Sequence, residues 1–487
     1  MIALENKNVL VLGLSPSGIA AARLLTQSRA KAILIDARNT PDLQVAAKEI
    51  SAVGIVVQLG ATSVPPGDFD FAVVSPEIPL RDAMLAEVKQ REIPVIGELE
   101  LGYQQSLCLN ISITGTNGIT TTAQLIEKVL EHCHRKTTIS DQLHAPMSSL
   151  IGQTKELDFL TLEVSSFQLE HTKFFRPTIA VLLNIAQDHL DRYESMAEYI
   201  STKARIFPNQ QAFDWAIVQS EALAQMRTLN LPVPAKVITF SANNRRADIF
   251  LDRGLIVSRL EGWAGPLLDM AKCRIRGPHN AESMMVALAV GRVLRLPLEQ
   301  TAEAMKNYEL PPHRLELVAE VNGVQFINDS KATNVGALNR ALLSIPEGRA
   351  GEPNVWLIAG GRDKGFNFHE IGPLLSQRVK GTFLIGEARE KIRAAWSLFT
   401  PCTLADSLLE AVRAATKCAV AGDIILLSPA CSSFDQFRGY EHRGEVYRNA
   451  VTDPARTTNS GIEVDDHKEM ERKLHANSAR GRREELK

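Results

Sequence analysis

One stretch of the chain constrains its fold more than any other. Apolar residues alternate with polar ones from Leu107 to Ile113, which predicts a buried strand, and apolar residues recur at helical spacing from Leu125 to Leu130. The turn Thr114-Gly115-Thr116-Asn117-Gly118 lies between them. A strand, a glycine-bearing turn and a helix N-terminus direct backbone N–H groups at an anion, and the helix dipole favours negative charge there. The stretch therefore predicts a phosphate-binding turn in an α/β fold.

The turn departs from the usual phosphate-binding motif at two positions. That motif ends in Gly-Lys-Thr/Ser, where the lysine meets the outer phosphates and the hydroxyl meets Mg²⁺. Here Ile119 stands at the lysine position, Thr120 keeps the hydroxyl, and Ile113 stands where the motif has its first glycine. The pattern alone leaves two interpretations open, a nucleotide site or an ordinary strand–turn–helix connection.

Length and charge narrow the class of protein. The 487 residues predict about three domains of ~100–200 residues each. A net charge of −2 argues against nucleic acid and against anionic membrane surfaces as partners. No apolar run approaches the ~18 residues of a membrane span. The six cysteines form no Cys-x-x-Cys pair, which suits a reducing compartment, so we expect a cytoplasmic protein.

The first hundred residues are typical of a doubly wound α/β unit. A helix is predicted over Ile19–Gln27, and strands are predicted over Asn8–Leu14, Ala32–Ile35, Ile55–Leu59, Phe71–Val74 and Ile93–Ile96. The first turn resembles a dinucleotide fingerprint with Ser15 in place of its middle glycine, and Asp36 lies where such folds hold a ribose. An NAD site is one interpretation, and a nucleotide-recognising crevice for another ligand is the alternative.

Polar side chains end two apolar strands of the central region. Glu163 closes one strand, and a cluster with Asp188, His189 and Asp191 follows another. A carboxylate at a strand end beside a phosphate turn is well placed to hold Mg²⁺. Capping or salt-bridging is the alternative role for each of these residues. Lys203 lies on a predicted helix, where a lysine is ordinarily a solvated surface residue.

A third α/β series begins after Pro311-Pro312, and the chain then ends in a polar stretch. Three strands of this series end in polar loops, at residues 328–334, 360–365 and 428–433, which are candidate site loops. Cys431 lies in the last loop, and we interpret it as structural because no base is spaced to activate it. From about Arg448 the apolar periodicity is lost, which predicts a disordered or loosely helical tail, and a basic docking segment is the alternative.

Taken together and in order, these motifs resemble the Mur ligases, and within them the branch that adds D-glutamate. The residues that carry the resemblance are Thr114 to Gly118, Glu163 to Leu169, Asn184 to Tyr193, Gly277 to Asn280, Pro312 to Arg314, Asn328 to Asn334 and Ser428 to Phe437. The Asn328 and Ser428 loops point to the D-glutamate branch, and the resemblance covers about Asn8 to Tyr447.

The resemblance implies a fold and a reaction. The expected fold class is α/β in three domains: a Rossmann-like domain over 1–96 for the UDP substrate, a central domain over 97–310 with a P-loop ATPase-like, mostly parallel sheet, and a Rossmann-like domain over 311–447 that closes the site. A polar tail, 448–487, would follow. The implied enzyme uses ATP and Mg²⁺ to join D-glutamate to UDP-N-acetylmuramoyl-L-alanine through an acyl phosphate, in peptidoglycan precursor synthesis. We expect a monomer.

The resemblance also implies roles for individual residues. Catalytic groups would be Lys203, His189, Glu163 and Lys331. Metal ligands would be Thr120, Glu163, His189 and Lys203, the last after carbamylation. ATP would be bound by Thr114, Gly115, Thr116, Asn117, Gly118, Ile119, Thr120, Thr121, Asn280, Arg314 and Asp329. The UDP substrate would be bound by Ser15, Asp36, Arg38, Gln142 and Ser165. D-Glutamate would be bound by Thr333, Lys364, Ser433 and Tyr440.

Three single positions and one turn depart from the family pattern. Ile119 replaces the phosphate lysine, Ser283 replaces an asparagine, and Glu77 replaces a glycine. Asp141-Gln142-Leu143-His144 stands where the family has Gly-Asn-Ile-Gly. Two hypotheses follow: a working ligase in which Lys331 or another cation compensates for Ile119, or an impaired homologue that binds ligands without efficient turnover.

Overall fold

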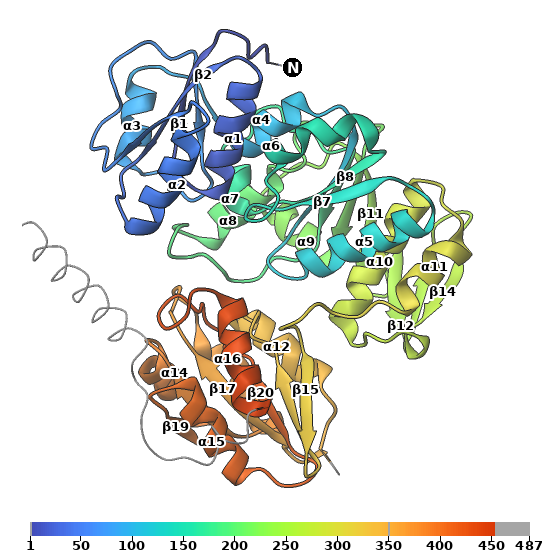
Figure 1. Ribbon diagram of the computed structural model, residues 1–487. Helices are drawn as coiled ribbons and strands as arrows, with labels where there is room; N and C mark the ends of the chain where they lie inside the picture. The colour runs from blue at the N-terminus through green and yellow to red at the C-terminus, as the bar shows by residue number, and fades with distance from the viewer. Residues whose placement is uncertain (1, 349–350, 453–487) are drawn as a thin grey trace, which may run out of the picture.

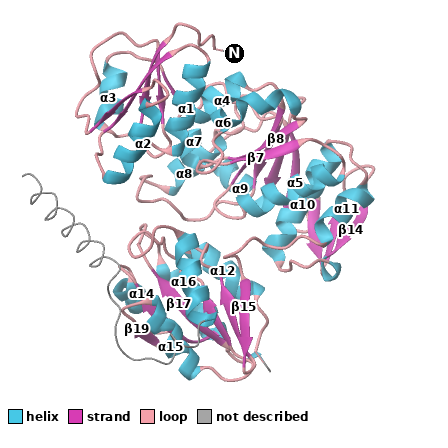
Figure 2. Cartoon of the chain, in the orientation of Figure 1, coloured by secondary structure: helices cyan, strands magenta, loops and turns pink. Residues whose placement is uncertain are grey.

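A computed structural model describes residues 2–348 and 351–452. The chain forms three units, each built around its own sheet (Figure 1). Helices pack against the faces of these sheets (Figure 2). This arrangement confirms the predicted fold class of mostly parallel α/β sheets in three domains. The boundaries predicted at 96/97 and 310/311 stay predictions.

The N-terminal unit is a five-stranded parallel sheet with the order β3-β2-β1-β4-β5. Its strands are β1 (Asn8–Leu12), β2 (Lys31–Asp36), β3 (Val56–Leu59), β4 (Phe71–Val74) and β5 (Val95–Gly97). Its helices are α1 (Pro16–Gln27), α2 (Pro41–Ser51) and α3 (Ala83–Gln90). The strand order reverses between β1 and β4, which is where parallel sheets open a ligand crevice.

Helix α1 begins three residues before the predicted start at Ile19. The Ser15 hydroxyl accepts a hydrogen bond from the Gly18 backbone N–H at 3.3 Å, and Pro16 occupies the first helical position. Both features favour a helix start, because the cap satisfies a free N–H and proline has none to lose. Strand β1 correspondingly ends at Leu12, two residues before the predicted Leu14.

The central unit is a nine-stranded sheet with the order β14-β13-β12-β11-β10-β9-β6-β8-β7. Strands β6 to β12 run parallel, and β13 and β14 add an antiparallel edge. The strands are β6 (Leu109–Thr114), β7 (Thr137–Ser140), β8 (Phe159–Glu163), β9 (Ile179–Leu182), β10 (Trp215–Gln219), β11 (Lys236–Ser241), β12 (Ile249–Asp252), β13 (Leu255–Ser258) and β14 (Gly265–Asp269). The helices are α4 (Glu98–Gln105), α5 (Ile119–His132), α6 (Met147–Leu150), α7 (Ser166–Leu169), α8 (Met196–Ala204), α9 (Ser220–Thr228), α10 (Pro278–Val293) and α11 (Leu298–Lys306).

Strand β6 is the predicted strand of the phosphate turn, and it lies between β8 and β9. The carboxyl ends of parallel neighbours meet at one edge of a sheet. The turn after Thr114, the carboxylate of Glu163 and the loop after Leu182 are therefore brought together, although they lie far apart in the sequence.

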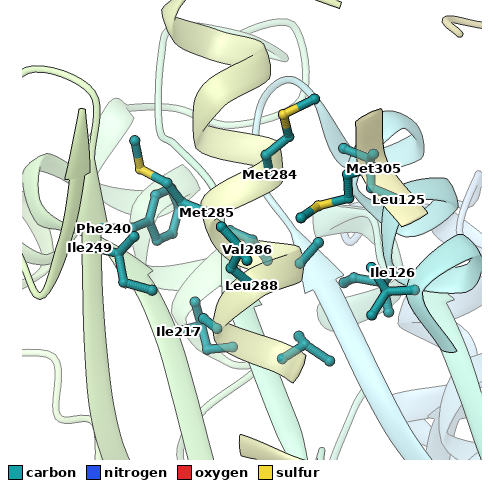
Figure 3. Packing of buried hydrophobic residues seen from close by; sticks show 14 of the residues in the cluster. Leu125, Ile126, Ile217, Phe240, Ile249, Met284, Met285, Val286, Leu288 and Met305 are labelled. Carbon is teal, nitrogen blue, oxygen red and sulfur yellow. The ribbon is translucent and has the colours of Figure 1, made fainter. Parts of the chain in front are cut away.

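Helix α10 forms the centre of the apolar core under this site. Figure 3 shows Met285 and Leu288 of α10 near Ile217 and Phe240 of the sheet, with Leu125 and Ile126 of α5 and Met305 of α11 on the other side. Every residue from Ser283 to Gly291 is buried. A helix that is apolar all round is stable only when it is enclosed in this way. The Thr122 hydroxyl of α5 donates to the Ser283 hydroxyl of α10 at 3.0 Å, which joins the two helices near their N-termini.

The C-terminal unit is a six-stranded sheet with the order β15-β16-β20-β17-β18-β19, parallel except for β15. The strands are β15 (Glu316–Val321), β16 (Val324–Asn328), β17 (Val355–Gly360), β18 (Val379–Ile385), β19 (Cys402–Leu404) and β20 (Ile424–Leu427). The helices are α12 (Val335–Ser344), α13 (Gly372–Arg378), α14 (Arg389–Trp396), α15 (Leu408–Cys418) and α16 (Tyr440–Thr452).

Helix α16 crosses the predicted start of the tail. It continues to Thr452, whereas the tail was predicted from residue 448. Ala450 is buried on this helix, so its last turn packs on the unit instead of leaving it. The rest of the predicted tail, 453–487, lies outside the described residues. Among the helices that the structure describes, none has both the length and the apolar character needed to cross a bilayer.

Candidate functional site

The phosphate turn is held against the loop that follows β9. The Thr116 backbone N–H donates to the Asn184 carbonyl oxygen at 2.9 Å. The Asn117 N–H donates to the Asn184 side-chain oxygen at 2.9 Å, and the Asn184 amide donates back to the Asn117 carbonyl at 2.8 Å. Gly118 precedes α5 with φ +88°, a conformation that favours glycine. A side chain at Gly115 would lie 2.9 Å from Leu183. The turn is therefore rigid, and its shape requires both glycines.

Ile119 is the first residue of α5, and its side chain is committed to packing. It is partly buried against the apolar cluster that contains α10, and it does not line the pocket beside the turn. The first turn of α5, Ile119 to Thr122, carries no charged side chain. Any phosphate at this helix N-terminus would meet backbone N–H groups and hydroxyls but no cation from α5.

Thr120 and Glu163 form the predicted pair beside the turn. The Thr120 hydroxyl donates to the Glu163 carboxylate at 2.7 Å. Burial raises the pKa of Glu163, while Thr120, Lys331 and Arg314 act in the opposite direction. Among the described residues, no group of three or more His, Cys, Asp or Glu side chains could hold a metal ion. The donors nevertheless fit Mg²⁺, which typically takes one or two carboxylates, water and substrate phosphates instead of an all-protein cage.

Lys203 lies inside the protein, so the ordinary interpretation of a helical lysine as solvated is wrong here. Lys203 is 2 % exposed, and its ammonium nitrogen donates to the Gly115 carbonyl oxygen at 2.7 Å. The same nitrogen lies 4.8 Å from the centre of the Tyr199 ring. Burial lowers the pKa of Lys203 to about 7, with Asp188 opposing the shift. A substantial fraction of the amine is therefore neutral near neutral pH.

His189 lies in the same cluster, with its ring 4.7 Å from the ring of Phe167. Its backbone has φ +55°, an uncommon conformation for a side chain of this size and one that clusters at functional sites. Burial lowers the pKa of His189 to about 4, so the ring is neutral and able to act as a metal ligand at neutral pH.

Two side chains of the C-terminal unit contact Asp188 of the central unit. The Asn334 amide donates to the Asp188 carboxylate at 3.0 Å and to the Asn117 side-chain oxygen at 3.3 Å. The Lys364 amine lies 3.8 Å from the other Asp188 oxygen. Asp188 thus ties the third unit over the phosphate turn, although only Lys364 of these two partners was among the predicted site residues.

A pocket opens between the phosphate turn and the C-terminal unit. Of the predicted ATP residues and catalytic groups, it is lined by Asn117, Gly118, Thr121, Asn280, Arg314, Asp329 and Lys331. It is also lined by residues that sequence reasoning missed, among them Gln219, Glu282 and Arg340. The spacing of Ala337, Arg340 and Ala341 on one face of α12 is the signal that could have found Arg340.

Asp329 is the buried carboxylate of this pocket. It accepts hydrogen bonds from the Leu315 N–H at 3.2 Å and from the Ser428 hydroxyl at 2.8 Å. Burial nevertheless raises the pKa of Asp329 to about 7, against the effect of these bonds and of Arg314. Burial likewise lowers the pKa of His279, on the opposite wall, to about 4, so His279 contributes no charge at neutral pH.

The predicted D-glutamate residues come from loops of the C-terminal unit and, for Tyr440, from the start of α16. Lys331 donates to the Tyr440 hydroxyl at 3.1 Å, and burial lowers the pKa of Lys331 to about 8. Ser433 is buried, and Thr333 is partly buried beside Ala332 of the pocket wall. Burial raises the pKa of the Cys431 thiol to about 12, which supports its interpretation as structural.

The predicted UDP residues lie where the N-terminal and central units meet. The Gln142 carbonyl accepts from the Ser17 hydroxyl at 3.1 Å, and its side-chain oxygen accepts from the Ser165 hydroxyl at 2.9 Å. The Ser15 hydroxyl lies 3.0 Å from that of Ser75. Asp36 is buried, accepts from the Leu14 N–H at 2.8 Å and pairs with Arg38 at 2.8 Å.

The altered turn at residues 141–144 is an ordered element. One Asp141 carboxylate oxygen accepts from the Leu143 N–H at 2.7 Å and from the His144 N–H at 2.6 Å. The His144 ring lies on the surface, 3.2 Å from the other carboxylate oxygen. The turn thus folds on itself through Asp141 and leaves Gln142 free to bridge the two units.

Comparisons with known proteins agree with this geometry. Three family descriptions match the chain: "Mur ligase MurD-like, N-terminal domain" over residues 7–97, "Mur ligase middle domain" over 113–291 and "Mur ligase, glutamate ligase domain" over 313–431. UDP-N-acetylmuramoylalanine–D-glutamate ligase of Acidobacterium capsulatum is 37% identical over 92% of this chain and 96% of its own length. The enzyme of that name from Geobacter metallireducens is 36% identical over 92% and 98%.

Solved structures support the fold. The MurF ligase of Thermotoga maritima in complex with ADP aligns over 93% of this chain and 99% of its own, with a TM-score of 0.59 and 13% identity. The UDP-N-acetylmuramate–alanine ligase MurC of the same organism aligns over 92% and 100%, with a TM-score of 0.56 and 16% identity. The match of three successive family domains and the identity to whole-length relatives lead to one conclusion: the chain belongs to the Mur ligase family.

Proposed function

We propose that the protein is an ATP-dependent ligase that joins D-glutamate to UDP-N-acetylmuramoyl-L-alanine, in peptidoglycan precursor synthesis. One observation carries the proposal: the phosphate turn and Lys331 line one pocket between two units. The Thr120–Glu163 pair lies beside the turn, and Lys331 is close enough to Glu163 to oppose the rise in its pKa. The relatives that match nearly the whole chain are named for this reaction.

The chemistry of amide formation accounts for the residue types in the pocket. The substrate carboxylate attacks the γ-phosphorus of ATP, ADP leaves, and an acyl phosphate forms. The D-glutamate amine then attacks the acyl carbon and releases phosphate. Anions must approach one another in the first step, so cationic side chains lower its barrier. Lys331, beside Glu163 and Arg314, is the group we assign to the transferring phosphoryl group.

Thr120 and Glu163 would hold the Mg²⁺ that accompanies ATP, and the ion would neutralise phosphate charge. His189 and Lys203 would hold a second ion if Lys203 is carbamylated, because carbamylation turns an amine into a carboxylate-like ligand. The lowered pKa of Lys203 supports this assignment, because only the neutral amine reacts with CO₂.

The residues predicted to bind the UDP substrate and D-glutamate are assigned the same roles in this proposal. Ser15, Asp36, Arg38, Gln142 and Ser165 would bind the UDP end at the boundary of the first two units. Thr333, Lys364, Ser433 and Tyr440 would frame D-glutamate, with Lys364 matching its side-chain carboxylate. We expect the protein to work as a monomer in the cytoplasm.

Phosphate release measured with ATP, UDP-N-acetylmuramoyl-L-alanine and D-glutamate tests the proposal. Release that requires both substrates is the expected result. Phosphate release without D-glutamate, or at the same rate when L-glutamate replaces D-glutamate, would contradict the assigned substrate. NAD in place of ATP should give no reaction and should not protect the protein against thermal unfolding.

The second candidate is a homologue that binds these ligands without efficient turnover. It is favoured by the packing of Ile119 in the apolar cluster, which leaves the first turn of α5 without a cation. Comparison of the chain with its Ile119→Lys variant separates the candidates. Activity only in the variant would favour the second candidate, and activity in both would favour the first.

A further inference from the structure

The charges that line the nucleotide pocket are unevenly divided between the two units. The cationic side chains are Arg314, Lys331 and Arg340, and all three follow residue 310. The central unit contributes the carboxylate of Glu282 and the neutral ring of His279. In the usual phosphate-binding motif the lysine lies on the same element as the turn. Here the charge reaches the pocket from the opposite wall.

Arg340 is the member of this trio without an assigned role. It lies on α12, and the positions at helical spacing from it face the central unit: Ala337 and Ala341 line the pocket, and the Ser344 hydroxyl lies 3.2 Å from the His279 ring nitrogen. The residue is not exposed, and one terminal nitrogen of its guanidinium is buried with no hydrogen-bond partner.

The carboxylates nearest to Arg340 are already engaged by other donors. Glu282 accepts from the Gln219 amide at 2.9 and 3.0 Å and from the Ala242 N–H at 3.1 Å. Asp329 accepts from Leu315 and Ser428. Within the described residues, neither carboxylate forms an ion pair with Arg340, although both act on its pKa, which burial lowers to about 10.

A buried guanidinium with a free N–H is costly, and a phosphate oxygen is the acceptor that suits it best. We propose that Arg340 is a nucleotide-binding residue whose guanidinium contacts the phosphate groups, so that the C-terminal unit supplies charge that Ile119 removes from the phosphate turn. This inference rests on the proposed function, since it takes the nucleotide to occupy this pocket. It makes tight nucleotide binding dependent on the closed position of α12.

Calorimetric titration of the full chain with adenosine, AMP and MgADP tests the inference without turnover. We expect Arg340→Gln to weaken MgADP binding by about 10- to 100-fold, the range for a hydrogen bond to a charged group. The loss should grow with the number of phosphates and be absent for adenosine. Arg340→Lys keeps the charge and should lose less. The matched control is Arg393→Gln, since Arg393 is a half-exposed arginine on α14 in the same unit.

A double-mutant cycle with Ile119→Lys tests the compensation itself. If the two cations share a role, Arg340→Gln should cost less in the Ile119→Lys background than in the parent. Unchanged MgADP affinity in Arg340→Gln would overturn the inference and leave the proposed function standing, as would an equal loss for adenosine. A parent chain that binds no MgADP would overturn both. Because Arg340→Gln removes an unpartnered buried charge, its ligand-free unfolding temperature should not fall, which separates a binding loss from misfolding.

Discussion

The side-chain amide of Asn334 lies 3.0 Å from the carboxylate of Asp188, and this hydrogen bond joins the C-terminal unit to the central one. The same amide lies 3.3 Å from the side-chain oxygen of Asn117 in the phosphate turn. The Asn334 oxygen accepts from the Ala337 N–H at 2.8 Å and so caps α12. One asparagine therefore starts the helix that carries Arg340 and fixes that helix over the nucleotide pocket.

Replacing Asn334 by Asp should separate these two roles. Aspartate keeps the helix cap but places a second carboxylate against Asp188, and like charges at this distance repel. We expect the KM for ATP to rise about tenfold, with little change in thermal stability. Asn334→Ser is the control, because it keeps a cap without adding charge and should have a smaller effect. An unchanged KM in Asn334→Asp would mean that this contact does not govern closure.

Lys203 should make the stability of the protein depend on alkaline pH. Its folded-state pKa is lowered from 10.5 to about 7, so between these values the unfolded chain binds the extra proton. The free energy of unfolding should therefore rise with pH from about 7 to 10.5, by up to about 1.4 kcal/mol per pH unit. The destabilisation caused by burying this amine is greatest below pH 7. Denaturant titrations at several pH values measure this slope. Lys203→Met should remove this pH dependence. Equal slopes in the parent and in Lys203→Met would contradict the interpretation of Lys203 as a buried, uncarbamylated amine.

Glu163→Gln should weaken Mg²⁺ binding at the site without unfolding the protein. The glutamine can still accept from Thr120, but it lacks the charge that a hard cation needs. We expect kcat to fall by about 10²–10³, as for removal of one preorganised charge stabiliser, and the Mg²⁺ concentration for half-maximal rate to rise. Glu131→Gln, at an exposed position of α5, the helix that carries Thr120, is the control and should retain the parent rate. A parental Mg²⁺ profile in Glu163→Gln would remove Glu163 from the metal site.

Ile119→Lys should increase the phosphoryl-transfer rate. A lysine at the first position of α5 can keep its aliphatic stem on the apolar cluster and extend its ammonium toward bound phosphate. The gain expected from one such charge is about 10²–10³ in kcat. Ile119→Met preserves the packing without the charge and should match the parent. If Ile119→Lys also matches the parent, the missing lysine does not limit the reaction, and the cations of the C-terminal unit suffice.

The elements around the phosphate turn could be predicted because their signals are local. The alternation before Ile113 and the helical spacing after Thr120 specify β6 and α5 within two residues. The position of Glu163 follows from topology, since parallel strand ends meet at one edge. The start of α1 is less well predicted, because residues 16–18 were assigned to the turn, whereas Ser15 caps a helix that begins at Pro16.

Burial and contacts between units could not be predicted from local sequence patterns. Lys203 lies on the buried face of α8 with Tyr199 and Ile200, and its amine donates to the Gly115 carbonyl, a contact that local sequence spacing does not show. Three short strands at the sheet edge, between residues 249 and 269, have no clear sequence signal, since each has only four or five residues. Arg340 lies six residues beyond a recognisable motif, on a helix whose orientation is set by Asn334 and Asp188.

Incorporation of labelled D-glutamate into a UDP-linked product by the unmodified chain tests the central claim most directly. With ATP, Mg²⁺ and UDP-N-acetylmuramoyl-L-alanine, the account predicts one glutamate joined for each ADP formed, and no product when L-glutamate replaces the D-isomer or when Lys364→Met replaces the parent. Absence of product from a folded parent that binds both MgADP and the UDP substrate would contradict the account and identify the chain as a binding protein with a ligase fold.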